Sequence, residues 1–164
     1  PRALTYVTQI SLGVKPAGFV SAEGRLDMLK LMRAWQKFWR QDGHLAAAGF
    51  AYREAGPHLM LMAFLQRIVN GGRSIQREFA LGSGRADLLV AHHGQRFALE
   101  LKLRRSERTQ QEGIEQLSAY LDRLGAREGY LILFERRPGM TWEEKLFESE
   151  ALGPAGQQIH IFGM

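Results

Sequence analysis

Two short apolar runs separated by a polar turn form the clearest pattern in the chain. Residues 88–91 and 97–103 have the length of strands and are rich in Leu, Val and Phe, with a turn from His92 to Gln95. The pattern predicts a β-hairpin. Because alternate residues of a strand share a face, Glu100 and Lys102 are expected to project together, opposite the leucines that flank them.

The remaining apolar positions predict an alternation of helices and strands. Apolar residues that recur every three or four positions indicate helices over 25–40, 54–70 and 109–124. Alternating or continuous apolar runs indicate strands over 4–14, 74–81, 128–135 and 157–162, the last at a sheet edge. We therefore expect an α/β fold with an αβββαβ core, a mixed central sheet and an N-terminal strand and helical extension, divided into residues 1–50 and 51–164.

Local signals mark the ends of some of these elements. Thr109-x-x-Glu112 has the spacing of a capping box, and Gly125 follows as the C-cap of the same helix. Glu143-Glu-Lys145 repeats the Glu-x-Lys motif of the hairpin, but no strand with a partner aspartate precedes it. We expect it to be an exposed segment anchored by Trp142.

The helix over 25–40 carries an aromatic stripe with basic neighbours. Trp35, Phe38 and Trp39 lie on its apolar side, with lysines and arginines interleaved. Such a stripe could stack on nucleic acid bases or pair with a second copy of the chain. Core packing is the more common role of aromatic residues at helical spacing, and we favour it.

Asp87 is a third charged residue of the hairpin, and it suggests a metal site. It opens the first strand, and in an antiparallel hairpin this position faces Glu100 and Lys102 across the ladder. Two converging carboxylates repel each other unless a cation joins them, and oxygen ligands suit Mg²⁺ or Mn²⁺. The alternative is an ion pair of Glu100 with Lys102 on an exposed strand face, with Asp87 a turn residue.

The spacing of these residues resembles the PD-(D/E)xK nuclease superfamily. Asp87 is followed thirteen residues later by Glu100-Leu101-Lys102 and then by a helix that carries Gln116, while Ala86 replaces the proline of the motif. More narrowly, segments 64–72, 77–89 and 142–147 look like the C-terminal nuclease-like domain of bacterial AAA-type ATPase proteins. The resemblance implies a restriction-endonuclease-like fold, metal-dependent cleavage of DNA, and an ATPase domain in the same parent chain.

The resemblance also implies roles for individual residues. The expected metal ligands are Asp87, Glu100, the backbone carbonyl of Leu101, and Glu54 on the first core helix. In nuclease relatives a glutamine at the place of Gln116 points at the metal site or the scissile phosphate. Two of these have structural alternatives, since Glu54 could simply complement the helix dipole and Gln116 could be an exposed helical residue.

The remaining expected contacts are with the substrate, and most of them are made by basic side chains. Lys102 would orient the attacking water or stabilise developing negative charge. Phosphates would be held through charge-assisted hydrogen bonds by Arg85, Arg104 and Arg105. Tyr120, one helical turn after Gln116, would help to position the nucleic acid backbone.

Charge and composition are compatible with a nucleic acid partner. The 164 residues carry a net charge of +5, and the stretch from Arg73 to Arg108 holds eight basic and four acidic residues, which is most of this excess. Such a stretch attracts DNA or RNA, or is a solvated arginine-rich surface. The absence of cysteine excludes disulfides, thiolate metal sites and a cysteine nucleophile, and fits a reducing cytoplasm.

The sequence shows no membrane or secretion signal. The longest apolar stretch, 59–65, is too short to span a bilayer, and the amino terminus has no signal-peptide pattern. The chain begins at Pro1 in mid-pattern, so we expect a fragment of a longer protein. The resemblance implies a bacterial protein, and the lack of cysteine fits a cytoplasmic one. The alternative to an active nuclease is a nuclease-fold module kept for nucleic acid binding, protein interaction or dimerisation.

Overall fold

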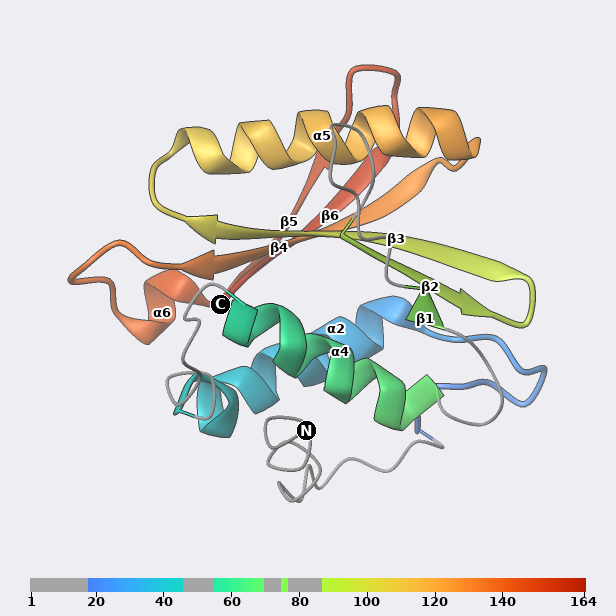
Figure 1. Cartoon of the computed structure of the whole chain (residues 1–164), viewed down its shortest axis with the longest axis horizontal. Helices are drawn as coiled ribbons and strands as arrows, with labels where there is room; N and C mark the ends of the chain where they lie inside the picture. Colours follow the sequence, from blue (N-terminus) through green and yellow to red (C-terminus); the bar gives the residue numbers. More distant parts are fainter. Residues whose placement is uncertain (1–17, 46–54, 70–74, 77–86) are drawn as a thin grey trace. The chain divides into compact units, whose positions relative to one another are not determined.

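A computed structural model of the chain describes residues 18–45, 55–69, 75–76 and 87–164 (Figure 1). The chain divides into two compact units. The first contains the described residues up to Ile75 together with the hairpin tip His92–Gln95, and the second contains the rest of the hairpin and everything after it. The division predicted between residues 50 and 51 stays a prediction.

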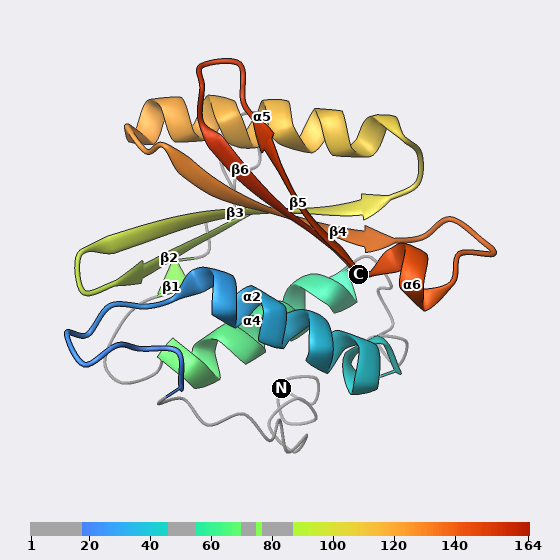
Figure 2. The same cartoon turned by 180° about the vertical axis from the view of Figure 1, so that it is seen from behind.

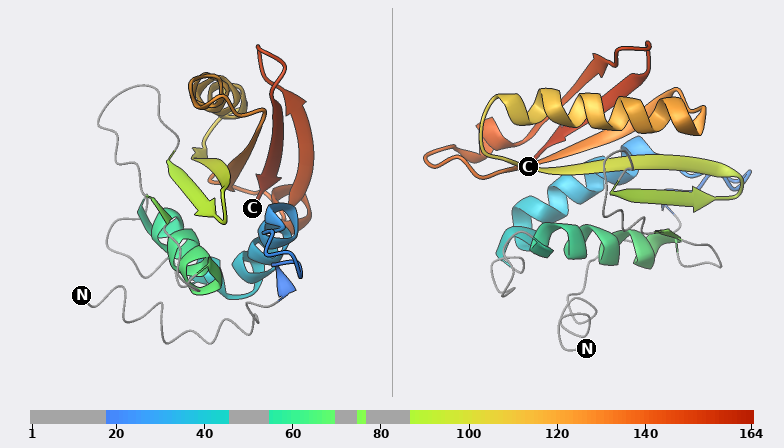
Figure 3. Two further views of the ribbon diagram at one scale, coloured as in Figure 1. Left: turned by 90° about the vertical axis from the view of Figure 1, so that its right-hand side faces the viewer. Right: turned by 45° about the horizontal axis from the view of Figure 1, so that its top comes forward.

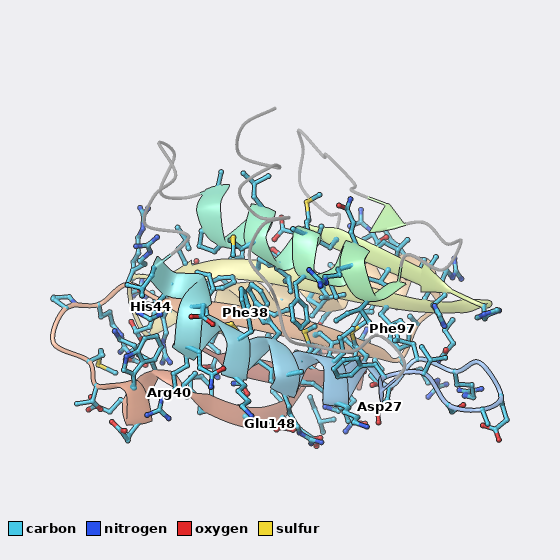
Figure 4. All side chains as sticks on the ribbon, turned by 90° about the horizontal axis from the view of Figure 1, so that it is seen from below. Asp27, Phe38, Arg40, His44, Phe97 and Glu148 are labelled. Atoms are coloured by element: carbon cyan, nitrogen blue, oxygen red, sulfur yellow. The ribbon has the colours of Figure 1, made fainter. Side chains whose placement is uncertain are left out.

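The first unit begins with a capped helix. Helix α2 spans Met28–Phe38 and continues as a π-helical turn, η2, over Trp39–Gly43. The Asp27 side chain accepts a hydrogen bond from the Lys30 N–H at 3.0 Å, so the helix starts later than residue 25 of the predicted range. Figure 4 shows Asp27 and His44 at the two ends of this helical segment.

Helix α4, Ala55–Val69, packs on α2 through aromatic side chains. Pro57 lies in its first turn, where the missing N–H has no helical partner to lose. The ring of Phe64 lies 5.2 Å from that of Trp35 and 5.8 Å from that of Phe38, and all three residues are buried. The core-packing interpretation of the aromatic stripe is therefore confirmed.

A mixed sheet of six strands in the order β1-β2-β3-β4-β6-β5 organises the fold. Strand β4 runs parallel to both β3 and β6, whereas β5 runs antiparallel to β6. The predicted α/β class with a mixed sheet is confirmed. The strands are β1 Ile75–Gln76, β2 Leu88–His92, β3 Gln95–Arg104, β4 Glu128–Glu135, β5 Phe147–Leu152 and β6 Gln158–Gly163.

The predicted hairpin is present as β2 and β3, with a tighter turn than expected. His93 and Gly94 form the whole connection, and both have positive φ angles, 44° and 80°. Two successive residues with positive φ are typical of the turn whose twist matches that of paired strands. A two-residue turn leaves no freedom in the strand register, which matters for the charged residues farther along the hairpin.

Helix α5, Arg108–Leu124, connects β3 to the parallel strand β4 and lies along one face of the sheet (Figure 3). Its inward side packs in a buried cluster with side chains from β2, β3, β4 and β6. Gly125 ends the helix with φ at 67°, as its predicted C-cap role requires. The members of this core cluster are Leu89, Ala98, Ile114, Leu117, Tyr120, Leu121, Leu131, Leu133, Ile159 and Ile161.

The capping box predicted at Thr109-x-x-Glu112 is wrong. The helix begins one residue earlier, with Glu107 at the N-cap and no side-chain capping bond. The buried Thr109 hydroxyl instead accepts the backbone N–H groups of Arg105 and Ser106, each at 3.4 Å. A threonine in the first turn of a helix can bond to the preceding loop as well as to the helix, and the local sequence does not distinguish the two.

The prediction that the last strand of the chain lies at the edge of the sheet is wrong. The strand expected at 157–162 is β6, and it lies between β4 and β5 (Figure 2). The outer strand is β5, which the sequence did not indicate because its residues are mostly exposed and lack an apolar alternation. Leu152 at its end is 77% exposed. An edge strand with little burial leaves a weak hydrophobic signal, whereas the buried β6 leaves a strong one.

Helix α6, Trp142–Lys145, gives the predicted exposed segment one capped turn. The Thr141 hydroxyl accepts the Glu144 N–H at 3.3 Å, and the Glu144 carboxylate accepts the Thr141 N–H at 2.7 Å. Lys145 Nζ lies 5.1 Å from the centre of the Trp142 ring. This reciprocal pair is the capping box of the second unit.

Replacing Thr141 with alanine is expected to lower the free energy of unfolding by about 1 kcal/mol, because the Glu144 N–H loses its acceptor. Urea unfolding followed by circular dichroism measures the change. Thr141→Ser keeps the hydroxyl and is expected to match the wild type, so equal losses in both variants would contradict the capping role.

Some predicted features lie outside the described residues. They are the strand over 4–14, the helix end at 70–72, most of the strand over 74–81, and the site residues Glu54 and Arg85. In the part of the chain that the structure describes, no helix has the length and apolar character needed to cross a membrane.

Candidate active site

Asp87 and Glu100 face each other across the β2–β3 hairpin. Counting back along both strands from the two-residue turn at 93–94 places Asp87 opposite Glu100. Leu89 and Ala98, two residues nearer the turn, both belong to the core cluster under α5. Since alternate residues share a face, both carboxyl groups project toward the side of the sheet that α5 covers.

The backbone of β3 holds the Asp87 carboxylate. Its Oδ2 accepts a hydrogen bond from the Leu101 N–H at 2.8 Å. In an extended strand the N–H and C=O of one residue point the same way, so the Leu101 carbonyl also points toward the Asp87 strand. The hairpin therefore brings together three of the four predicted metal ligands.

Glu100 is a buried carboxyl group with an unusual protonation equilibrium. It is 4% exposed, and among the described residues its Oε2 has no hydrogen-bond partner. Burial, and then the neighbouring charge of Asp87, raise the pKa of Glu100 from 4.5 to about 7, against the opposing attraction of Lys102. A buried carboxyl group held beside another is unfavourable for folding and is typical of a functional site.

Lys102 connects the strand to helix α5. Its Nζ lies 3.1 Å from Glu100 Oε1 and also donates a hydrogen bond to Gln116 Oε1 on the helix. The same-face placement expected from the strand period is confirmed for Glu100 and Lys102. The ion pair of the alternative interpretation is present, but its exposed setting is wrong, because α5 covers this face and Glu100 is buried.

The two arginines at the end of β3 have different surroundings. Arg104 Nη2 pairs with Glu107 at 2.8 Å, and the guanidinium lies over the Phe147 ring, with only 13% of the side chain exposed. Arg105 is exposed in the connection to α5. Arg104 is therefore engaged by neighbouring side chains, while Arg105 is exposed.

Tyr120 does not share the setting of Gln116. It is 7% exposed within the core cluster, whereas Gln116 is exposed. Residues four apart on a helix are offset by about 40°, which is enough to separate them at the border of a buried face. The predicted contact of Tyr120 with nucleic acid is therefore not supported by its position.

Sequence reasoning missed Glu107, which supports the end of β3 from the start of α5. Besides Arg104 it contacts Arg137, and Arg137 in turn binds Glu135 at 2.9 Å. The three-residue spacing from Arg104 to Glu107 could have indicated their ion pair. Arg137 lies thirty residues farther along the chain, and no local pattern indicates its contact with Glu107. This network holds the ends of β3 and β4 together beside the candidate site.

The donors at the hairpin fit a hard divalent cation. Two carboxylates and a carbonyl offer only oxygen, which Mg²⁺ and Mn²⁺ prefer. A cation between Asp87 and Glu100 would relieve the repulsion between them and give Glu100 Oε2 a partner. Within the described ranges no group of three His, Cys, Asp or Glu residues completes such a site, and the predicted ligand Glu54 lies outside those ranges.

Comparison with known proteins supports the nuclease resemblance. Residues 53–131 match the model of a protein family described as the endonuclease NucS C-terminal domain. No match was found among curated proteins or among solved structures. The resemblance to ATPase-associated domains stays a prediction.

The matched stretch contains the hairpin with Asp87, Glu100 and Lys102, the helix α5 with Gln116, and the start of β4. The match supports the PD-(D/E)xK-like relationship, and the mixed sheet with its crossover helix is consistent with it. The described part of the chain is therefore an α/β fold consistent with a restriction-endonuclease-like one, and residues 53–131 are similar to a nuclease domain.

Proposed function

We propose that this domain is a divalent-metal-dependent nuclease that hydrolyses phosphodiester bonds in DNA. The observation that carries the proposal is the convergence of Asp87, the Leu101 backbone, Glu100 and Lys102 at one place on the hairpin. The match to an endonuclease domain over the same residues supports it. RNA is the alternative substrate.

Each residue has a task in this reaction. When bound, Mg²⁺ or Mn²⁺ would supply an activated water and polarise a phosphoryl oxygen. Asp87, Glu100 and the Leu101 carbonyl would hold it, with the Leu101 N–H keeping Asp87 in place. Lys102 puts an ammonium beside the carboxylates, where it can stabilise negative charge that develops on the phosphate.

Gln116 and Arg105 have supporting tasks. Gln116 accepts a hydrogen bond from Lys102 and so orients the ammonium toward the reacting groups. Arg105 is exposed next to the end of β3, where it can contact a phosphate of the bound strand. The ATPase domain in the parent chain, a homodimer and the cytoplasmic location stay predictions from the sequence.

Cleavage of supercoiled plasmid DNA tests the proposal. The wild type with Mn²⁺ or Mg²⁺ is expected to nick the plasmid, and EDTA should stop it. Asp87→Asn, Glu100→Gln and Lys102→Met are each expected to reduce the rate at least about 100-fold, because each removes a charge from the reacting centre. Glu115→Gln is the matched control, since this exposed carboxylate on α5 precedes Gln116 without touching the site. Equal rates in the wild type and the three site variants would refute the assignment.

The second candidate is a nucleic acid-binding module without chemistry. The absence of a third acidic ligand within the described residues is the observation that favours it. Calorimetric titrations with Mn²⁺ and with a DNA duplex separate the two. DNA binding without Mn²⁺ binding would favour the module, and an RNA duplex of the same sequence reports the preferred nucleic acid.

A further inference from the structure

Gly113 lies where a glycine is unfavourable for local structure. It is buried in the interior of α5, and only proline is a poorer residue there. Its φ angle is not among the positive ones, so no turn requires a glycine. The reason for the glycine must be sought in what lies against it.

A side chain at Gly113 would collide with the sheet. A Cβ atom there would lie 2.7 Å from Leu131 Cδ1 and 3.4 Å from Lys102 Cγ. Leu131 is fully buried in the core cluster, so its methyl groups would have to shift within a close-packed interior. A larger residue would therefore push α5 away from β4 at Leu131 and from the neighbouring strand β3, whose Lys102 Cγ it would just touch.

The close approach has a consequence for the candidate site. Gln116 lies three residues after Gly113, on the adjacent turn of the helix, and its Oε1 accepts from Lys102 Nζ. The same Nζ lies 3.1 Å from Glu100 Oε1. A helix displaced outward would withdraw Gln116 and leave the ammonium with Glu100 alone.

We infer that Gly113 is a positioning residue for Lys102, acting by letting α5 lie close enough to β3 for the Lys102–Gln116 hydrogen bond. Its effect on catalysis rests on the proposed nuclease function, while its effect on the Lys102 side chain does not.

Gly129 on β4 provides a matched control. A Cβ atom at Gly129 would lie 2.8 Å from Leu121 Cδ1 and 3.1 Å from Leu117 Cδ2, so it too would crowd the contact between α5 and the sheet. Neither Lys102 nor Gln116 is among its nearest neighbours. Gly129→Ala therefore loosens the same interface without touching the lysine.

The experiment compares Gly113→Ala with Gly129→Ala in the full chain. One readout is the NMR signal of the Lys102 side-chain ammonium, assigned by its loss in Lys102→Arg. The other is the rate of plasmid nicking with Mn²⁺. Gly113→Ala is expected to move the ammonium signal and to lower kcat about 10- to 100-fold with a smaller change in KM. Gly129→Ala crowds α5 at Leu117 and Leu121 instead of at the turn over Lys102, so it is expected to move the signal less than Gly113→Ala does and mainly to lower the melting temperature.

A second substitution tests whether crowding is the cause. Leu131→Val shortens the side chain by one carbon and so removes the Cδ atoms that a residue at Gly113 would meet first. The double variant Gly113→Ala/Leu131→Val is therefore expected to bring back the wild-type ammonium signal. If Gly113→Ala alone does not fold, the test is the double variant: a folded protein with the wild-type ammonium signal supports the inference, and an altered signal overturns it.

Three results would overturn the inference: an unchanged ammonium signal in Gly113→Ala, an equal change in Gly129→Ala, or an altered signal that the double variant does not restore. A wild type that does not cleave DNA would end the proposed function, but the ammonium signals would still decide the role of Gly113.

Discussion

Replacing Glu100 with glutamine is expected to stabilise the protein at pH 8 and to change its stability little at pH 5. Burial and the charge of Asp87 raise the pKa of Glu100 from 4.5 to about 7 in the folded state. The folded state therefore binds this proton more tightly than the unfolded chain does. The stabilisation is complete below pH 4.5 and is lost as the pH rises through 7.

The size of the effect follows from the pKa difference. It corresponds to about 3 kcal/mol of unfolding free energy, which the wild type loses on going from acid to pH 8. Glutamine has no charge to bury, so the variant keeps this stability. Lys102 loses an ionic partner but is partly exposed and keeps Gln116, an offset of less than about 1 kcal/mol.

Urea unfolding at pH 5 and pH 8 in the absence of divalent metal measures the difference. The unfolding curves of the wild type and the variant at pH 5 are the control, because they report any effect of the substitution other than the loss of charge. If the unfolding free energies of the wild type and Glu100→Gln changed equally between pH 5 and pH 8, the raised pKa of Glu100 would be contradicted. If the proposed metal site is real, added Mg²⁺ at pH 8 stabilises the wild type and not the variant, because the ligand must be ionised.

Replacing Trp35 with alanine is expected to lower the unfolding free energy by about 3 to 5 kcal/mol. The side chain is fully buried, with ring centres at 5.4 Å from Phe38, 5.6 Å from Trp39 and 5.2 Å from Phe64. Removing it leaves a cavity in the packing of α2 against α4. Close-packed interiors relax only partly around such a cavity.

Trp35→Phe is the matched variant. Among the described residues Trp35 Nε1 has no hydrogen-bond partner, so phenylalanine gives up little polar bonding while it keeps most of the apolar contact. We expect it to retain most of the stability, measured by circular dichroism during urea unfolding. Unchanged DNA affinity in Trp35→Phe would also agree with a core role, whereas a stable alanine variant with lost DNA binding would favour base stacking.

The elements that local pattern predicted well are those whose burial is one-sided or complete. The hairpin, α5 and β4 have strong apolar periods because each faces the core cluster, and their predicted bounds agree with the structure to within about two residues. Strand β5 escaped prediction because an edge strand buries few side chains. The capping box at Thr109 was wrong because the hydroxyl bonds to the loop instead.

Prediction of the candidate site was uneven for a physical reason. Asp87, Glu100 and Lys102 meet because strand period and hairpin register are local rules. The inward position of Tyr120 depends on how α5 rotates against the sheet, which its own spacing does not determine. The engagement of Arg104 depends on the neighbouring Glu107 and on Phe147 from another strand.

The sequence by itself determined the hairpin, the order of most elements and the convergence of two acids with a lysine, because these follow from periods of two and from a short turn. Only the tertiary structure decided which side of α5 is buried, how closely the helix approaches β3 at Gly113, and how strongly burial changes the acidity of Glu100. Packing distances and dielectric environment arise from residues far apart in the chain, so no local pattern contains them.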